Sequence, residues 1–213
     1  MGFLDTILGR SKPVRPDLDN LFGLPSATIT LATVGVKPTG SAAVAFRAPE
    51  GKAFADVQAE ITELLERSSG PAVDLQTDEY GYSWLMMTTD PPDISELVTG
   101  LHAINVSLQD AGFGSSLLCS LVSFTDRTDR RFALVYLFKQ GTFYPFVPEA
   151  DGSRLRDNIS ELKLRDLIAD DVAVGEVSDR WCRMALHGPT GPALLDEAVE
   201  VSEGSVAPGK LGP

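Results

Sequence analysis

The chain has 213 residues, of which 43% are hydrophobic, and its 30 acidic and 18 basic side chains give a net charge of -12. A nucleic-acid-binding surface needs clustered Lys and Arg to neutralise phosphates, so this charge argues against one. The sequence has no run of about 18 apolar residues of the kind that spans a membrane. The length suffices for one folded domain with a substantial core. We therefore expect a globular protein that binds no nucleic acid.

The first 16 residues differ from the rest of the chain in charge. Arg10, Lys12 and Arg15 stand there against a single acid, Asp5. The segment is too short to form a stable helix alone, so we expect an amphipathic helix that docks on its own domain, on a partner helix or on a membrane surface. The opening lacks the pattern of a secretory signal, which favours the cytoplasm. The apolar side chains at helical spacing are Phe3, Leu4, Ile7 and Leu8.

The first regular elements follow from hydrophobic periodicity. Residues 27–34 and 42–48 are apolar, β-prone runs separated by Lys37-Pro38-Thr39-Gly40, which predicts a hairpin. Residues 54–65 then repeat apolar side chains with the period of an amphipathic helix, and Gly70-Pro71 ends it.

A second hairpin and a second helix come next. Residues 72–77 and 80–89 alternate as strands joined through Asp78-Glu79. Asp93 supplies a helix start, and the helix expected over residues 93–111 ends at Gly112.

Three strands and two helices complete the predicted elements. Residues 117–124 and 132–138 are almost continuously apolar, which is typical of central strands covered on both faces, and 142–147 is a third strand. A helix is predicted over residues 153–170 and a last short one over residues 178–187, with Trp181 and Met184. The side chains expected to face inward from the first of these are Leu155, Ile159, Leu162 and Leu167.

The order of these elements predicts an α+β domain whose largely antiparallel sheet carries helices on one face. We place this domain at residues 25–187. Residues 1–24 form the basic amphipathic segment and its linker. Residues 188–213 hold five glycines and four prolines, which predicts a disordered acidic tail.

Two histidines and two cysteines limit the chemistry available to the chain. His102 lies within the helix expected over residues 93–111, where a structural position is favoured over a general base. Cys119 lies in an apolar run far from Cys182, so reduced cysteines are expected rather than a disulfide. Walker, Rossmann, EF-hand and H-E-x-x-H patterns are missing from the sequence. We therefore predict no catalytic residues, no metal and no cofactor.

Two groups of aromatic residues favour a surface that binds protein. One lies on one face of the strand expected over residues 80–89, and the other follows the turn at Gly141. Such a stripe is either the core face of a sheet or, where it stays exposed, a protein-binding surface. The candidate binding residues are Tyr80, Tyr82, Trp84, Phe143, Tyr144 and Phe146.

Four segments carry a family resemblance: MGFLDTILGRSKPVRPDLDNLFGLPSA at the start, DEYGYSWLMM at 78–87, LVTGLHAINVSLQDAGFGSSLLC at 97–119, and RFALVYLFKQGTFYPFVP at 131–148. Over residues 1 to about 187 the chain resembles the PspA-associated PspAB family of actinobacteria, an accessory of the phage-shock envelope-stress system. The expected fold is also similar to YbjN-like and type III secretion chaperone-like proteins, whose known members bind proteins. That second similarity is an analogy of fold alone.

The resemblance implies a cytoplasmic, non-enzymatic adaptor that works with PspA, a coiled-coil protein that assembles on the stressed inner membrane. It carries over no catalytic residue and no cofactor. Two alternatives stay open: a chaperone-like, homodimeric protein-binding module, and an enzyme with a site near His102 or Cys119. Peripheral contact with the inner face of the membrane, or with a partner, would use the opening segment through Phe3, Leu4, Ile7, Leu8, Arg10 and Lys12.

Overall fold

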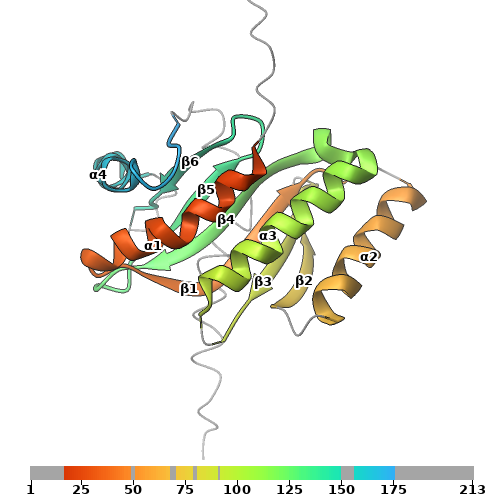
Figure 1. The fold of residues 1–213 in the computed structure, drawn as a ribbon, viewed down its shortest axis with the longest axis horizontal. Coiled ribbons are helices and arrows are strands. Elements are labelled where there is room, and N and C mark those ends of the chain that lie inside the picture. Colours follow the sequence, from red (N-terminus) through yellow and green to blue (C-terminus); the bar gives the residue numbers. More distant parts are fainter. Residues whose placement is uncertain are drawn as a thin grey trace, which may run out of the picture.

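The chain folds around one antiparallel sheet in the order β2-β3-β1-β4-β5-β6 (Figure 1). The strands are β1 (Lys37–Phe46), β2 (Ala72–Thr77), β3 (Ser83–Thr88), β4 (Leu117–Thr125), β5 (Arg131–Leu137) and β6 (Thr142–Phe146). The helices are η1 (Leu18–Gly23), α1 (Leu24–Thr33), α2 (Lys52–Arg67), α3 (Ile94–Leu108), η2 (Gln109–Phe113), η3 (Gly114–Ser116) and α4 (Asn158–Ile168). This computed structural model describes residues 17–48, 51–67, 71–78, 81–90, 92–149 and 156–175.

The helices form a row on one side of the sheet. Contacts join α4 to α1, α1 to α3, and α3 to α2, in the order seen from left to right in Figure 1. α1 and α3 lie over the middle strands, and α4 flanks the β6 edge. The α+β class with a largely antiparallel sheet is therefore confirmed, whereas the chaperone-like fold stays a prediction.

The segment expected to be the first strand, residues 27–34, is helical for most of its length. α1 buries Leu24, Ala27 and Leu31, whose spacing of three and four residues places them on one helical face. Pro25 lies in the first turn, where the missing N–H breaks no helical hydrogen bond. The β-branched residues of this segment favour a strand locally. Burial of the leucine stripe against the sheet outweighs that preference.

The turn expected at residues 37–40 is instead the start of β1. Gly40 has a φ of 87°, and the pairing of β1 with β4 shifts register between Pro38 and Ala42. The Pro-Gly pattern therefore marks a bulge inside a long strand, not a hairpin turn. As a result β1 lies inside the sheet, paired with β3 on one side and β4 on the other.

The remaining strands lie where the sequence predicts them, and so do the helices α2 and α3. The Asp93 carboxylate caps α3 by accepting hydrogen bonds from the N–H groups of Ser95 and Glu96. α3 ends at Leu108, and Gly112, with a φ of 87°, interrupts the helical backbone inside η2. Within α3, a Cβ at Gly100 would lie 2.7 Å from the sulfur of a methionine on β3, so glycine lets the helix approach the sheet closely.

α4 is shorter than the helix expected over residues 153–170 and faces the sheet differently. Ile159 and Leu162 were expected to face inward, but they are 68% and 53% exposed. Glu161 is buried in their place because its carboxylate has partners there, which are described below. Leu167 does pack against the main core, as expected.

Both faces of the sheet are apolar. The main core lies between the sheet and the helices, and it already includes Leu18 and Leu21, upstream of the domain boundary expected at residue 25. The opposite face carries a second cluster, which we call the back-face cluster. Its buried members are Ala43, Ala45, Trp84, Leu121, Ala133, Val135, Leu137, Tyr144 and Phe146.

Some predictions concern residues outside the described ranges. They are the opening segment 1–16 with its six candidate contact residues, Tyr80, Leu155, Cys182, the helix expected over residues 178–187, and the acidic tail 188–213.

Candidate protein-interaction surfaces

The outward surface of α1 and α3 is almost free of charge. α1 has no Asp, Glu, Lys or Arg among its 10 residues, and α3 has only Glu96 among 15, in a chain that is 23% charged. The two helices contact each other at the centre of the row (Figure 1). We call their outward side chains, together with the preceding Phe22, the uncharged belt. It consists of Phe22, Ser26, Ile29, Thr33, Ser95, Thr99, His102 and Ala103.

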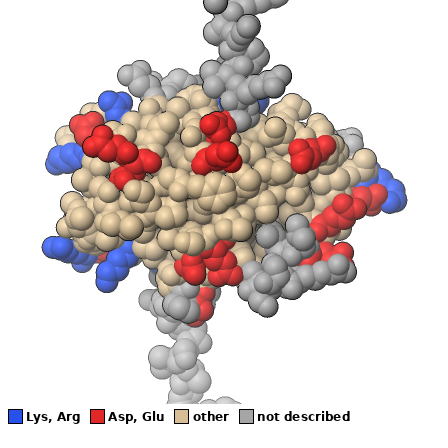
Figure 2. Space-filling view, viewed as in Figure 1, with Lys and Arg blue, Asp and Glu red and all other residues tan. Residues whose placement is uncertain are grey.

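The belt combines exposed apolar side chains with a polar border. Ile29 is 72% exposed and Phe22 is 51% exposed. Figure 2 shows a band without Lys, Arg, Asp or Glu across the centre of this face, with acidic side chains above and below it. Centres of protein interfaces are depleted of charge and bordered by polar residues, and the belt has this anatomy. Sequence reasoning missed it, although the lack of charge in residues 24–33 was visible in the sequence.

His102 lies within the belt at the junction of α3 with η1. Its Nε2 atom is 3.5 Å from Oδ1 of Asp19, and its ring centroid is 4.8 Å from that of Phe22. The side chain is partly exposed. These contacts hold η1 against α3, and they are of the structural kind expected for His102.

A shallow hollow extends the belt toward α2. It has a volume of about 310 Å³ and lies between α2 and α3. Val57 and Ile61 line it from α2, and Ser107 lines it from α3. Glu60 and Ala111 also line it. The hollow gives the outer surface of α3 a groove on its α2 side.

The predicted aromatic residues are buried in two different layers. Trp84, Tyr144 and Phe146 belong to the back-face cluster, with exposed fractions of 5% or less, and the partly buried Tyr82 packs against them. Phe143 points to the other side of the sheet and is fully buried in the main core. The aromatic groups therefore do not form a single stripe, and those with described burial are not open to solvent as a patch.

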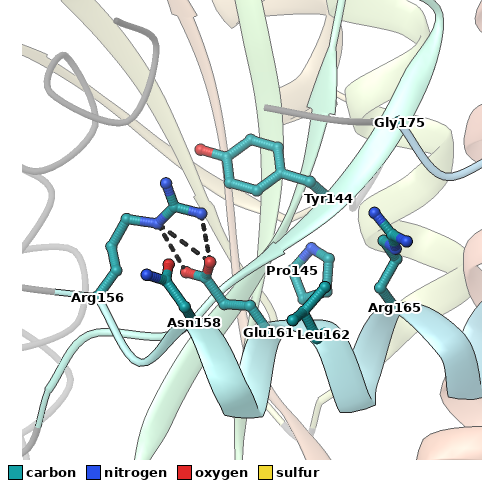
Figure 3. Close-up of a pocket in the computed structure, with 8 residues that line it drawn as sticks. All are labelled: Tyr144, Pro145, Arg156, Asn158, Glu161, Leu162, Arg165 and Gly175. Atoms are coloured by element: carbon teal, nitrogen blue, oxygen red, sulfur yellow. Dashed lines mark hydrogen bonds and ion pairs between the residues drawn. The ribbon is translucent and has the colours of Figure 1, made fainter. Parts of the chain in front are cut away.

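A hollow of about 280 Å³ lies where α4 meets β6 (Figure 3). Glu161 projects from α4 and accepts hydrogen bonds from Nε of Arg156 at 3.0 Å and from the backbone N–H of Val147 at 3.0 Å. A buried carboxylate needs such partners because desolvation disfavours its charge. The hydrogen bond from Val147 fastens α4 to the end of β6, and Arg156 balances the charge of Glu161. The residues lining the hollow are Tyr144, Pro145, Arg156, Asn158, Glu161, Leu162, Arg165 and Gly175.

Cys119 lies on β4 among the residues that pack against the back-face cluster. It is a free cysteine, and burial raises the pKa of its thiol to about 12. The thiolate is the nucleophilic form of cysteine, so the protonated thiol present near neutral pH is a poor nucleophile.

Within the described ranges no three His, Cys, Asp or Glu side chains gather closely enough to hold a metal ion. No helix of the described part is long and apolar enough to cross a membrane.

The fold and its surfaces define an α+β protein with one helical layer and an exposed, charge-depleted surface of the kind that contacts other proteins. A sequence model of the family described as PspAB, PspA associated protein B, matches residues 1–189. The chain belongs to this family, which confirms the resemblance. Searches of curated proteins and of solved structures found no match. The family match includes the opening segment and continues 14 residues beyond Gly175, where the described part ends.

Proposed function

We propose that the protein is a non-enzymatic adaptor in a PspA-linked membrane-stress response and that it binds a helical segment of PspA through the uncharged belt. Membership of the PspA associated protein B family supports a role linked to PspA. The belt is the observation that carries the proposal, because it is exposed, apolar in part and nearly free of charge.

The belt favours a helical partner. Side chains on two adjacent helices form ridges and grooves into which the ridges of another helix pack. Ser26, Thr99 and Ala103 are small, so they let a partner approach, while Phe22 and Ile29 are the larger apolar side chains that act as anchors. The acidic side chains bordering the band in Figure 2 complement Lys and Arg beside an apolar stripe on the partner.

The basic opening segment adds a second contact to the proposal. The described chain starts at Asp17, and Asp19 already contacts α3 at the belt. The opening segment joins the described part directly at Asp17, so it leaves the fold close to the belt. We assign this segment to the inner face of the membrane in the cytoplasm, because apolar side chains beside Lys and Arg bind anionic lipid surfaces.

The described chemistry supports an adaptor over an enzyme with a site near His102 or Cys119. His102 contacts Asp19 and Phe22 at an exposed helix junction, and Cys119 is a protonated thiol on a strand. The belt also supports the homodimeric alternative, because a second copy of the chain could cover it in the way that PspA would. The experiment below separates these two occupants.

The test is recovery of PspA from the native host with tagged variants of this chain. Ile29→Glu places a charge at the centre of the belt, and we expect PspA recovery to fall at least about tenfold. Ile159→Glu is the matched control, because Ile159 is similarly exposed but lies on α4. Equal recovery with both variants would contradict the proposal. Recovery of a second, untagged copy in place of PspA would support the dimer instead.

Deletion of residues 1–16 tests the membrane contact separately. The deleted chain should leave the membrane fraction while it still binds PspA in solution. Unchanged membrane association after the deletion would contradict the role of the opening segment.

A further inference from the structure

The back face of the sheet requires a second layer. β1, β4 and β5 are buried on both faces over most of their length. An antiparallel sheet that faces water alternates apolar and polar residues, and these strands do not. The helices of the described ranges bury their side chains in the main core, whereas the buried members of the back-face cluster all come from strands. Something other than these helices must therefore cover this face.

The side chains of the back face differ in size from strand to strand. β1, inside the sheet, contributes only Ala43 and Ala45 to the buried cluster. Trp84 on β3 is paired directly with Ala45. Tyr144 and Phe146 stand on β6, at the far edge of the sheet. The two alanines beside Trp84 leave space there for larger side chains of a covering segment.

The described chain ends at the border of the back face. The N–H of Phe143 donates to the carbonyl of Ala173 at 2.7 Å, and the N–H of Gly175 donates to the carbonyl of Phe143 at 2.9 Å. Gly175 also lines the same hollow as Tyr144 of the back-face cluster (Figure 3). The residues that follow Gly175 therefore start beside β6, next to the back face.

The sequence after Gly175 suits this face in pattern and length. Val177, Trp181, Met184 and Ala185 fall on one side of a helical projection, and Arg183 falls on the other. A helix over residues 178–187 would be about 15 Å long, at about 1.5 Å per residue. Strands lie about 4.8 Å apart, so this length reaches from β6 across β5 and β4 to β1. The family match extends to residue 189 and so includes the whole segment.

We infer that residues 176–187 form the second layer, as an amphipathic helix that leaves the β6 edge and lies across the back-face cluster with Trp181 and Met184 facing the sheet. The aromatic side chains of this face are then occupied by the chain's own C-terminal segment. An external partner would then bind the opposite side of the molecule, where the belt lies. The inference does not depend on the proposed function, because it involves no PspA.

Cys119 is a natural reporter of this cover, because it packs against the back-face cluster and the chain has only two cysteines. In a Cys182→Ser chain, its alkylation by iodoacetamide reports access to the back face. We expect the rate to rise at least about tenfold when Trp181→Glu and Met184→Glu are added. Deletion of residues 190–213, beyond the family match, is the control and should leave the rate unchanged.

Three results would overturn the inference. They are rapid alkylation before the glutamates are added, no acceleration after they are added, and a rate that rises on dilution of the parent chain. The last result would identify a second copy as the cover. Circular dichroism must show that the double variant is folded.

A second measurement applies if the double variant does not fold. In a Trp84→Phe chain Trp181 is the only tryptophan. Its quenching by acrylamide should be several-fold weaker in the native chain than in urea. Equal quenching in the two states would overturn the inference.

Discussion

The four α-helices of the described part form two pairs with different outer surfaces. α2 and α4, at the ends of the row, carry exposed charge, such as the Lys52–Asp56 ion pair at 2.7 Å on α2 and Asp166 on α4. α1 and α3, between them, carry only Glu96. Both pairs contribute apolar side chains to the same main core. Core packing explains the inner faces of all four helices, so it does not explain why the outer faces of one pair lack charge.

One member of each pair, α3 and α4, also differs in how it is attached to the sheet. α3 is held by buried leucines and by Asn105, whose side-chain amide donates to Oγ of Ser120 on β4 at 2.8 Å. α4 depends more on charge, through the Arg156–Glu161 pair and through Arg130, whose guanidinium lies 2.9 Å from the Asp157 carboxylate. In α3 an uncharged surface therefore accompanies mainly apolar attachment, and in α4 a charged surface accompanies ionic attachment.

The largest expected effect is a difference in stability between substitutions on the buried and exposed sides of α1. Leu31→Ala removes a fully buried side chain and should lower the free energy of unfolding by about 3 kcal/mol. Ile29→Ala removes an exposed side chain from the same helix and should change it by less than about 0.5 kcal/mol. Urea denaturation measures both values. A large loss of stability with Ile29→Ala would mean that the belt stabilises the fold. The absence of charge on α1 and α3 would then no longer indicate a binding surface.

A smaller, pH-dependent effect is expected at the start of α4. Hydrogen bonds from the side chain and backbone of Ser160, followed by the charge of Arg130, lower the pKa of Asp157 to about 2. Because this pKa lies below the ordinary value of 3.8, the ionised carboxylate stabilises the fold above pH 4, and this stabilisation is lost as the pH falls toward 2. Asp157→Ala should cost about 1 kcal/mol near pH 7.

The difference between Asp157→Ala and the wild type should shrink between pH 4 and pH 2. Denaturation curves recorded across this range measure it. Leu31→Ala is the control, because the cost of a lost apolar contact should not follow the titration of a carboxylate. A difference between Asp157→Ala and the wild type that stays constant down to pH 2 would contradict the ionic attachment of α4.

The sequence predicts an element correctly where the local conformational preference of its residues agrees with the structure that burial favours. α2 and α3 have a helical period together with recognisable starts or ends, and the β2–β3 hairpin alternates as strands do. α1 was predicted as a strand because its β-branched residues favour one locally, while the burial of Leu24 and Leu31 against the sheet decides the outcome. The prediction of which side chains of α4 face inward was wrong, because the hydrogen-bond donors that allow Glu161 to be buried come from outside the helix.

The candidate surface was only partly predictable. Tyr82 and Trp84 share a face, as the two-residue period of a strand requires, yet the period does not reveal whether that face is covered. The belt depends on α1 and α3 lying side by side, and this contact follows from tertiary packing rather than from either segment alone. A helix without charged residues indicates a binding surface only once the elements packed beside it are known.

The most direct test of the belt is amide hydrogen exchange of this chain with and without purified PspA. Bound PspA should slow exchange in peptides from α1 and α3, residues 24–33 and 94–108, and leave α2 and α4 unchanged. Ile29→Glu should abolish this protection, whereas Ile159→Glu should preserve it. Protection confined to α2 or α4, or none under conditions where PspA binds, would contradict the account.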